Sequence, residues 1–415
     1  MLDIKYIRQN PEKVEKAAKD KGVDIDVKKV LELDSKYRDL DLEVQKLREE
    51  RNANASQIKG KPTEEQIKKG QEIKQKLEGL EKSLTEGYEK LRTELLKIPN
   101  PAKDDVKVGK NDTENDVIRK VGTPTKFGFK PKDHLDLGEA LGIIDVTRAS
   151  KISGARFYFL KKEGALLEFA LRELAFEILL KEGFIPVIPP VMIKTEVMKG
   201  LGYMENGGDE DMYVFDKDNL VLVGTSEQSI VSMHTDETLE ENELPKRYVG
   251  FSTCFRREAG SYGKDTKGIL RAHQFDKIEM VSFVKQGEDD KEHEYLLSLE
   301  EKLLQALDLP YQVVKMCTGD LGFPAARKYD IEAWIPSENK YREVTSTSTT
   351  TDFQSRRLNI KYKEDGKTEY AAILNGTAFS TRPIVAILEN YQNEDGSVNV
   401  PKVLQKYLGI SVIKQ

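Results

Sequence analysis

The sequence predicts an α+β protein in which a helical amino-terminal part precedes a large antiparallel sheet flanked by helices. Apolar residues recur at spacings of three and four through residues 30–98, as they do in a coiled coil. From residue 134 onward, many short apolar or alternating segments are separated by few helical patterns, which indicates an antiparallel sheet. Neither G-x-G-x-x-G nor G-x-x-x-x-G-K-[ST] occurs, which argues against a dinucleotide-binding fold and a Walker-type ATPase.

The helical part is predicted to be one long antiparallel hairpin. Its seam consists of Leu33, Tyr37, Leu40, Val44 and Leu47 in the first block and Ile73, Leu77, Leu80, Leu84, Tyr88, Leu91, Leu95 and Ile98 in the second. Gly60 and Pro62 separate the blocks, and Thr63 with Gln66 forms a capping box that begins the second helix. Each arm would be about 45 Å long. The alternative role for such a hairpin is dimerisation or packing against the rest of the chain.

Length, charge and cysteine content limit the kinds of protein that this chain can be. The 415 residues suffice for two or three domains, and the net charge is −6. If nucleic acid is a partner, its positive contacts must therefore be local. Residues 51–69 at the hairpin tip carry five Lys or Arg against two Glu, a modest excess that is compatible with a phosphate backbone. The chain has no bilayer-length apolar stretch, no secretion-signal pattern at its amino terminus and only two cysteines. We therefore expect a cytoplasmic location and no membrane partner.

The remaining elements follow from periodicity. A helix is predicted over 163–181, and the strand that follows over 184–190 contains three prolines, which favour an edge position at a dimer interface or facing solvent. Residues 1–29 are predicted as a small helical element and 101–133 as a connector with an edge strand. Further strands are predicted at 220–223, 247–255, 277–283, 311–314, 329–334, 342–346 and 369–374, and further helices at 292–307 and 382–392.

The most informative stretch is FRREAGSYGKDTKGILRAHQFDKIE at 255–279. It predicts two strands joined by a polar loop that holds Gly260, Gly263 and Gly268. Two arginines, a carboxylate and an aromatic ring would face one another across this hairpin, which carries Arg256, Arg257, Glu258 and, after the loop, Arg271 to Phe275. Arginine forks suit phosphate oxygens, and an aromatic face suits a nucleobase. The alternative is a half-buried hairpin whose outer face carries ordinary charges.

Three further stretches carry candidate residues. Thr225-Ser226-Glu227 could hold an ammonium group and a neighbouring hydroxyl, or could simply begin a helix with Thr225 as its N-cap. Glu343, with Ser346 three residues on, offers hard oxygen ligands for Mg²⁺ that bridges phosphates, unless the Ser/Thr run there is a loop. Arg382 at a predicted helix start suits a bound anion, or is a solvated arginine. No H-E-x-x-H or G-x-S-x-G motif occurs, so the chemistry is expected to rely on positioning and electrostatics.

In order and spacing these stretches resemble the seryl-tRNA synthetases of bacterial type, a class II aminoacyl-tRNA synthetase family, from Met1 nearly to the end. The matching segments are the MLDIK…NP start, the hairpin, SGARFYFL at 153–160, motif 1 at about 163–190, motif 2 at about 248–280, KYDIEAWIPS at 328–337, DFQSRRLNIKY at 352–362 and motif 3 at about 370–392. The resemblance implies a tRNA-binding domain at 1–100, with its coiled-coil arm at about 30–98, and a class II catalytic domain at 101–415. It also implies a homodimer and a sheet of six to seven strands.

The resemblance further implies a serine–tRNA ligase, with L-serine, ATP, Mg²⁺ and tRNA(Ser) as its ligands and the arm as the tRNA contact. Serine would be activated to seryl-adenylate, and the seryl group would then pass to the 3′ end of the tRNA. The residues expected to bind ATP are Arg256, Arg257, Glu258, Arg271, Phe275, Glu343, Val344, Thr345, Ser346 and Arg382. Those expected to bind serine are Thr225, Ser226, Glu227, Arg256, Glu279 and Thr377.

Within these sets, Arg256, Glu258, Glu343 and Arg382 are the expected catalytic residues, and Glu343 with Ser346 the metal ligands. The resemblance assigns Arg256 to the α-phosphate, Glu258 and Phe275 to the adenine, and Glu343 with Ser346 to Mg²⁺. Arg271 would bend the distal phosphates back, and Arg382 would lie on the other adenine face or near the γ-phosphate. Glu279 and Thr377 would recognise the serine hydroxyl.

This chain departs from the family pattern in three places. Ser226 stands where alanine is usual, and Thr349 stands where asparagine is usual. Motif 3 is one residue short between Thr377 and Arg382, with Thr381 in place of the customary glycine. Two other functions remain open: a paralogue that passes seryl-adenylate to another acceptor, and a regulatory protein with an inactive catalytic fold. The retained hairpin argues against the first, and the intact Arg256, Glu258 and Glu343 argue against the second.

Overall fold

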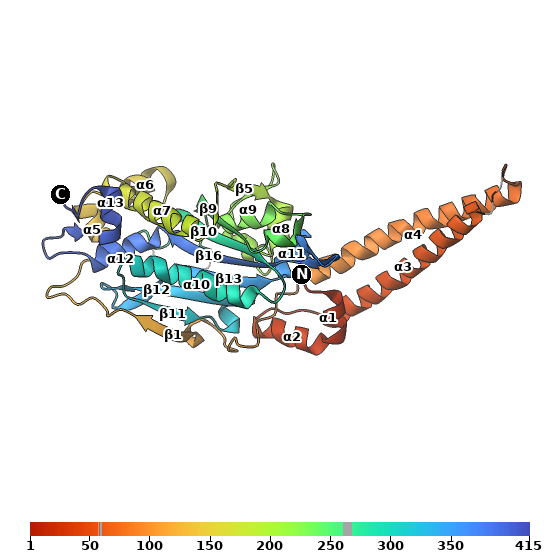
Figure 1. Ribbon diagram of the computed structural model, residues 1–415, viewed down its shortest axis with the longest axis horizontal. Helices are drawn as coiled ribbons and strands as arrows, with labels where there is room; N and C mark the ends of the chain where they lie inside the picture. Colours follow the sequence, from red (N-terminus) through yellow and green to blue (C-terminus); the bar gives the residue numbers. More distant parts are fainter. Residues whose placement is uncertain (57, 59, 260–267) are drawn as a thin grey trace. The chain divides into compact units, whose positions relative to one another are not determined.

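The computed structural model describes residues 1–56, 58, 60–259 and 268–415. Within it the chain forms two compact units, Met1–Pro99 and Asn100–Gln415, drawn in Figure 1. Lys59 of the predicted basic tip and Gly260 and Gly263 of the predicted glycine loop lie outside the described residues.

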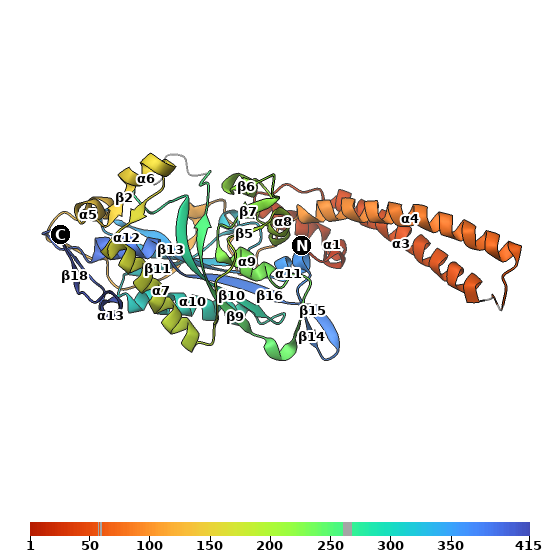
Figure 2. The same cartoon turned by 90° about the horizontal axis from the view of Figure 1, so that it is seen from above.

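The first unit consists of helices. They are α1 (Ile4–Gln9), α2 (Pro11–Asp20), α3 (Val27–Ser56) and α4 (Glu64–Leu96). The two long helices run antiparallel side by side, which confirms the predicted hairpin (Figures 1 and 2). Val44, Ile73 and Leu77 form a buried cluster on its seam. The predicted capping box begins α4, because the Thr63 hydroxyl accepts from the Gln66 amide at 3.2 Å while the Gln66 side chain accepts from the Thr63 amide at 3.0 Å.

The second unit is built on an eight-stranded sheet with the order β1-β11-β12-β13-β16-β10-β9-β4. Its strands are β1 (Asp116–Val121), β4 (Ile185–Val187), β9 (Lys246–Phe255), β10 (Gln274–Val284), β11 (Tyr311–Lys315), β12 (Arg327–Ile335), β13 (Lys340–Thr351) and β16 (Ala372–Ser380). All neighbours pair antiparallel except β4 and β9. The expected antiparallel sheet is confirmed, and it has eight strands where the resemblance implied six or seven. The prolines in 184–190 confine β4 to three residues at the sheet edge, as predicted.

Helices cover one face of this sheet. The further helices of the unit are α5 (His134–Ala140), α6 (Val146–Ser153), α7 (Glu163–Lys181), α8 (Thr195–Leu201), α9 (Ser226–Ser232), α10 (Asp289–Ala306), α11 (Phe353–Leu358), α12 (Arg382–Asn390) and α13 (Gln405–Leu408). Helices α7, α10 and α12 pack against one face, where Leu303, Ile331 and Phe379 belong to the main core. The short helix α9 packs on β9 and β10, where Ile230 lies against Gly250. None of the described helices is both long and apolar enough to cross a membrane.

Small sheets complete the unit, and one of them corrects a prediction. Their strands are β2 (Ile144–Asp145), β3 (Phe159–Leu160), β5 (Met192–Lys194), β6 (Val214–Phe215), β7 (Leu220–Leu222), β8 (Thr238–Glu240), β14 (Lys361–Glu364), β15 (Lys367–Tyr370), β17 (Val398–Asn399) and β18 (Val412–Ile413). The strand predicted at 369–374 is wrong, because β15 ends at Tyr370 and β16 begins at Ala372. Asp365 and Gly366, both with positive φ, make the tight turn between β14 and β15. This Asp-Gly pair is the sequence signal from which the β14–β15 hairpin could have been predicted.

The Ser/Thr run at 345–351 belongs to strand β13 and is not a loop. Its alternate threonines face the helical layer: the Thr345 hydroxyl donates to Glu300 at 3.0 Å and the Thr349 hydroxyl to Asp289 at 2.9 Å, both on α10. All four side chains are buried. Thr349 therefore lies in a strand that is joined to α10 by hydroxyl–carboxyl hydrogen bonds.

Because the seam of the hairpin is buried, shortening one of its side chains should destabilise the hairpin locally. Leu77 is 3% exposed on α4, whereas Leu42 on α3 is 55% exposed. We expect Leu77→Ala to lower the free energy of opening of α3 and α4 by about 2–5 kcal/mol, through lost burial and a cavity. Amide hydrogen exchange, read peptide by peptide, measures this. The exposed control Leu42→Ala should leave the protection of the amides from exchange nearly unchanged. Equal effects of the two substitutions would contradict the assignment of Leu77 to a buried seam.

Candidate active site

A bulge in β13 determines which side chains face the side of the sheet opposite to α7, α10 and α12. Residues three apart in a regular strand point to opposite faces, yet Glu343 and Ser346 share one face. In the pairing with β12, Ile331 lies opposite Thr345 and Glu332 opposite Glu343, so Val344 is an extra residue. The spacing of three therefore brings both predicted metal ligands to the same side, away from α10.

A second bulge lies in the neighbouring strand β16. In the pairing with β10, Lys277 lies opposite Ser380 and Glu279 opposite Thr377, so one extra residue separates the two pairs on β16. Thr377 and Ser380 are consequently aligned with the same side of the sheet as Lys277 and Glu279. Two adjacent bulged strands thus gather polar side chains over the middle of the sheet.

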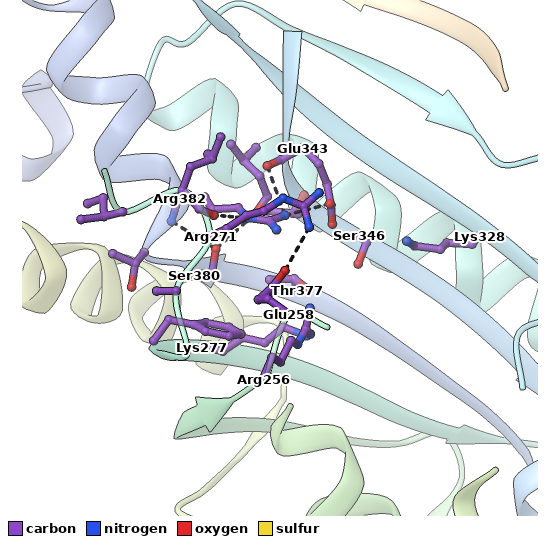
Figure 3. A pocket seen from close by; sticks show the side chains of 17 residues that line it. Arg256, Glu258, Arg271, Lys277, Lys328, Glu343, Ser346, Thr377, Ser380 and Arg382 are labelled. Atoms are coloured by element: carbon purple, nitrogen blue, oxygen red, sulfur yellow. Dashed lines mark hydrogen bonds and ion pairs between the residues drawn. The ribbon is translucent and has the colours of Figure 1, made fainter. Parts of the chain in front are cut away.

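Except for Glu279, these side chains line one pocket, shown in Figure 3. It is lined by Arg256, Glu258, Ile269, Leu270, Arg271, Ala272, Phe275, Lys277, Lys328, Glu343, Val344, Thr345, Ser346, Thr377, Ser380, Thr381 and Arg382. They come from the segment between β9 and β10, from the first half of β10, from β12, β13 and β16, and from the start of α12. The structure therefore brings together all four residues predicted to be catalytic and nine of the ten predicted to bind ATP.

The pocket contains two ion pairs between its own walls. Arg382 lies 2.8 Å from a carboxylate oxygen of Glu343, and Arg271 lies 3.0 Å from one of Glu258 (Figure 3). Burial alone would raise the pKa of Glu343, but the charges of Arg382 and Lys328 outweigh it and hold that pKa well below its usual range. Glu343 is therefore an anion at neutral pH, and it fixes the guanidinium of Arg382 inside the pocket.

The shortened motif 3 does not turn Arg382 away. The side chain of Arg382 also donates from Nε to the Leu270 carbonyl at 3.3 Å. The preceding Thr381 is buried, and its hydroxyl accepts a hydrogen bond from Tyr158 at 3.1 Å. These contacts anchor the first turn of α12 although one residue of the family pattern is missing.

Arg256 occupies the opposite wall. It follows β9 directly, donates from Nε to the Gly224 carbonyl at 3.2 Å, and places its guanidinium 5.3 Å from the centre of the Phe275 ring. Phe275 belongs to β10, beside which β9 runs in antiparallel register. The predicted strand–loop–strand arrangement therefore places Arg256, Glu258, Arg271 and Phe275 around one pocket, and not on a solvated outer face.

A buried group of charges adjoins this pocket. Lys277 Nζ lies 2.6 Å from Glu279 Oε2 and donates to the Thr225 hydroxyl at 3.0 Å. Burial raises the pKa of Glu279 to about 7, with the charge of Lys277 opposing the shift and that of Glu227 adding to it. Thr225 stands at the N-cap position of α9, but its hydroxyl makes no capping hydrogen bond and accepts from Lys277 instead. This residue thus contributes to the charged group and not to a helix start alone.

Three predicted site residues point elsewhere. The Arg257 guanidinium lies over the Tyr213 ring at 5.8 Å, outside the residues that line the pocket. The Ser226 hydroxyl lies 3.0 Å from that of Ser252 in the packing of α9 on β9. The Thr345 side chain faces α10, so only its backbone can contribute to the pocket.

Sequence analysis missed two lysines that line the pocket. Lys277 alternates with Phe275 and Glu279 on β10, and this period of two could have found it. Lys328 lies two residues before Asp330 on β12, and its Nζ lies 3.1 Å from the Asp330 carboxylate. That same period of two could have placed both on the pocket face.

The described residues hold no cluster of three or more His, Cys, Asp or Glu side chains that could bind a metal by themselves. Glu343 and Ser346 supply two hard oxygens, one of them anionic, on one face of β13. This donor set suits Mg²⁺ only if phosphate and water oxygens complete its shell, which is the usual arrangement where Mg²⁺ accompanies a nucleotide.

Comparison with known proteins matches both parts of the chain to family models. Residues 1–102 match the seryl-tRNA synthetase N-terminal domain, and residues 213–391 match the tRNA synthetase class II core domain (G, H, P, S and T). The chain is 45% identical over 418 residues to the serine–tRNA ligase of Thermobifida fusca, covering 100% of this chain and 99% of that protein.

Solved structures agree in fold. A crystal structure of seryl-tRNA synthetase from Pyrococcus horikoshii complexed with ATP superposes with a TM-score of 0.91 at 42% identity, over 100% of this chain and 99% of that one. The cytoplasmic serine–tRNA ligase of Naegleria fowleri in complex with AMP gives 0.87 at 32% identity, over 100% and 99%. This chain therefore belongs to the seryl-tRNA synthetase family of class II aminoacyl-tRNA synthetases.

Proposed function

We propose that the chain is a serine–tRNA ligase that activates L-serine with Mg·ATP to seryl-adenylate and transfers the seryl group to the 3′ end of tRNA(Ser). The observation that carries this proposal is the single pocket in which Arg256, Glu258, Glu343 and Arg382 meet, next to the buried group around Lys277. The names of the relatives from T. fusca and P. horikoshii, and the ATP complex of the latter, support the same activity.

In the first step, an oxygen of the serine carboxylate bonds to the α-phosphorus, and the bond from that phosphorus to pyrophosphate breaks. Both reactants are anionic, so the reaction depends on charge neutralisation and alignment. Arg256 would hold the α-phosphate from one wall, while Arg271 and Arg382 would neutralise the distal phosphates from the other. The adenine would lie against Phe275, with its edge near Glu258.

Glu343 and Ser346 would hold Mg²⁺ together with the phosphate oxygens of ATP. When bound, the ion supplies further positive charge to the phosphates. The low pKa of Glu343 keeps this ligand ionised throughout the neutral range. Because Arg382 pairs with Glu343 from the other side, the same carboxylate would orient both the metal and the arginine.

The buried group beside the pocket would select serine. Glu227 and Glu279 are 3% and 1% exposed, and they can hold the ammonium group and accept a hydrogen bond from the hydroxyl. Thr377 faces Glu279 across the β10–β16 pair and would contact the same hydroxyl. Alanine is rejected because it would leave the Glu279 carboxyl without its partner, whereas threonine must be excluded by space.

In the second step, a ribose hydroxyl at the tRNA 3′ end attacks the seryl carbonyl, and AMP leaves. The coiled-coil arm α3–α4 would bind the tRNA through its backbone and shape. Arg51, Lys61, Lys68 and Lys69 are exposed near the tip of the arm, which suits contacts to phosphates. The domain roles therefore follow the two units, with 1–100 binding tRNA and 101–415 carrying the catalytic site.

The enzyme would act as a homodimer in the cytoplasm. Apolar side chains are exposed on α7, on β4 and just beyond β4: Leu166, Phe169, Leu180, Ile185 and Ile188. This stretch is the motif 1 segment, and such a patch suits an isologous contact with a second copy of the chain. A cytoplasmic location follows from the substrates of the proposed reaction.

Arg256 provides the most direct test of the activation site. We expect Arg256→Ala to abolish serine-dependent ATP–pyrophosphate exchange, because the α-phosphate would lose its facing cation. Arg119→Ala serves as the control, since Arg119 pairs with Glu301 outside the pocket and its loss should leave exchange near normal. Near-normal exchange in the Arg256 variant would refute the assignment.

The arm can be tested by deletion. Removal of residues 36–97 should spare serine-dependent exchange, because the pocket lies wholly within the second unit, and should abolish serylation of tRNA(Ser). Both rates are measured on the same preparation. If both activities survive, the arm is not the tRNA contact; if exchange persists and even the full chain fails to charge tRNA, the paralogue hypothesis is favoured.

Glu279 is expected to set the choice of amino acid. Glu279→Ala should lower kcat/KM for serine in the exchange assay by about 10- to 100-fold, because a hydrogen bond to a charged acceptor is lost. Alanine should then compete better with serine than it does in the wild type. Glu279→Gln, which keeps an acceptor oxygen, should be less impaired. An unchanged preference for serine over alanine in Glu279→Ala would exclude this role.

A further inference from the structure

Glu227 is held by two side chains from other parts of the chain. Tyr203 donates its hydroxyl to Glu227 Oε1 at 2.7 Å, and Gln354 Nε2 donates to the same oxygen at 3.3 Å. Tyr203 follows α8, whereas Gln354 belongs to α11. The short distance and the buried setting make the Tyr203 bond the stronger of the two.

The position of Tyr203 is itself fixed by α11. Arg357 donates to the carbonyls of Lys199 and Gly200 at 2.7 and 2.9 Å, and thereby satisfies the last carbonyls of α8. Gly202 then ends the helix with φ +87°, and a side chain there would meet the Phe353 ring at 3.0 Å. The chain turns within two residues from the end of α8 to Tyr203, so little freedom remains for the phenol.

The hydrogen bond also affects the charge of Glu227. Burial raises the pKa of this carboxyl, whereas the Tyr203 bond, the charge of Lys277, the Gln354 bond and the charge of Arg256 lower it. Glu279, on β10 beside Lys277, is the other carboxyl in this group. Because the phenol stabilises the ionised form, removing it should raise the pKa of Glu227.

We propose that Tyr203 is a positioning residue that holds the Glu227 carboxylate to receive the ammonium group of the amino-acid substrate. The inference rests on the proposed function and deepens it. Tyr203 acts through Glu227 and need not touch the substrate. With the phenol in place, one carboxylate oxygen is occupied and the other is left for the ammonium, so the orientation of the carboxylate is set before serine arrives.

The test is Tyr203→Phe in the full chain, measured by serine-dependent ATP–pyrophosphate exchange at varied serine, ATP and pH. We expect the KM for serine to rise about tenfold, as for the loss of one hydrogen bond to a charged group, while the KM for ATP changes by less than about twofold. The acid limb of kcat/KM for serine should move to higher pH, because less Glu227 is ionised at a given pH.

Two controls separate this role from general packing. Tyr295 on α10 donates its hydroxyl to Glu182 at 3.0 Å outside the pocket, so Tyr295→Phe removes the same kind of bond and should change neither KM. In a Glu227→Gln background, adding Tyr203→Phe should cost much less than it does alone, since the charge that the phenol stabilises is gone.

The inference is overturned if Tyr203→Phe leaves the KM for serine and the acid limb as in the wild type. It is equally overturned if the KM values for serine and ATP rise together, which is the result of a loss of general packing. Either outcome leaves the proposed ligase intact, provided that the wild-type chain exchanges with serine. A wild-type chain without serine-dependent exchange would overturn the proposed function and this inference together.

Discussion

The site depends on how two extra residues in the central sheet are held in register. The bulge at Val344 and the second bulge in β16 turn Glu343 with Ser346, and Thr377 with Ser380, to one side of the sheet. A slip by one residue would exchange the faces of every side chain in β13. The threonine hydroxyls that donate to Glu300 and Asp289 on α10 oppose such a slip, because a slip would leave these buried carboxyl groups without their hydrogen-bond donors. The helical layer thus fixes the register, and the register fixes the pocket.

Opposite charges within the pocket then keep its arginines in place. Arg382 is paired with Glu343 and Arg271 with Glu258, so neither guanidinium has to be ordered from solvent when an anion binds. A nucleotide that binds in this pocket would exchange carboxylate contacts for phosphate contacts. The same principle applies to the amino acid, because Glu279 is paired with Lys277 and Glu227 accepts a hydrogen bond from the Tyr203 phenol. In the proposed reaction, both substrates meet charges that are set beforehand.

Much of this arrangement could be predicted from local sequence. The seam that contains Val44 and Leu77 predicted the helical hairpin, and the prolines after α7 predicted an edge strand. The chemistry of the residues around Arg256 and Phe275 suited a nucleotide but left a solvated charged hairpin as the alternative, and the structure places these residues around one pocket. What failed depended on contacts distant in the chain. The Ser226 side chain lies against Ser252 because α9 packs on β9. Tyr203 was not predicted as a site residue, because only the packing of α8 on α11 brings it to Glu227. The short motif 3 could not be judged without the contacts of Thr381 and Leu270.

The central claim is that one preset pocket joins serine to the α-phosphate of ATP. Its most direct test is ATP–pyrophosphate exchange by the wild-type chain, measured separately with each of the twenty amino acids and Mg²⁺. We expect exchange that depends on serine, with alanine and threonine far weaker. Exchange driven by a different amino acid, or no exchange with any of them, would contradict it.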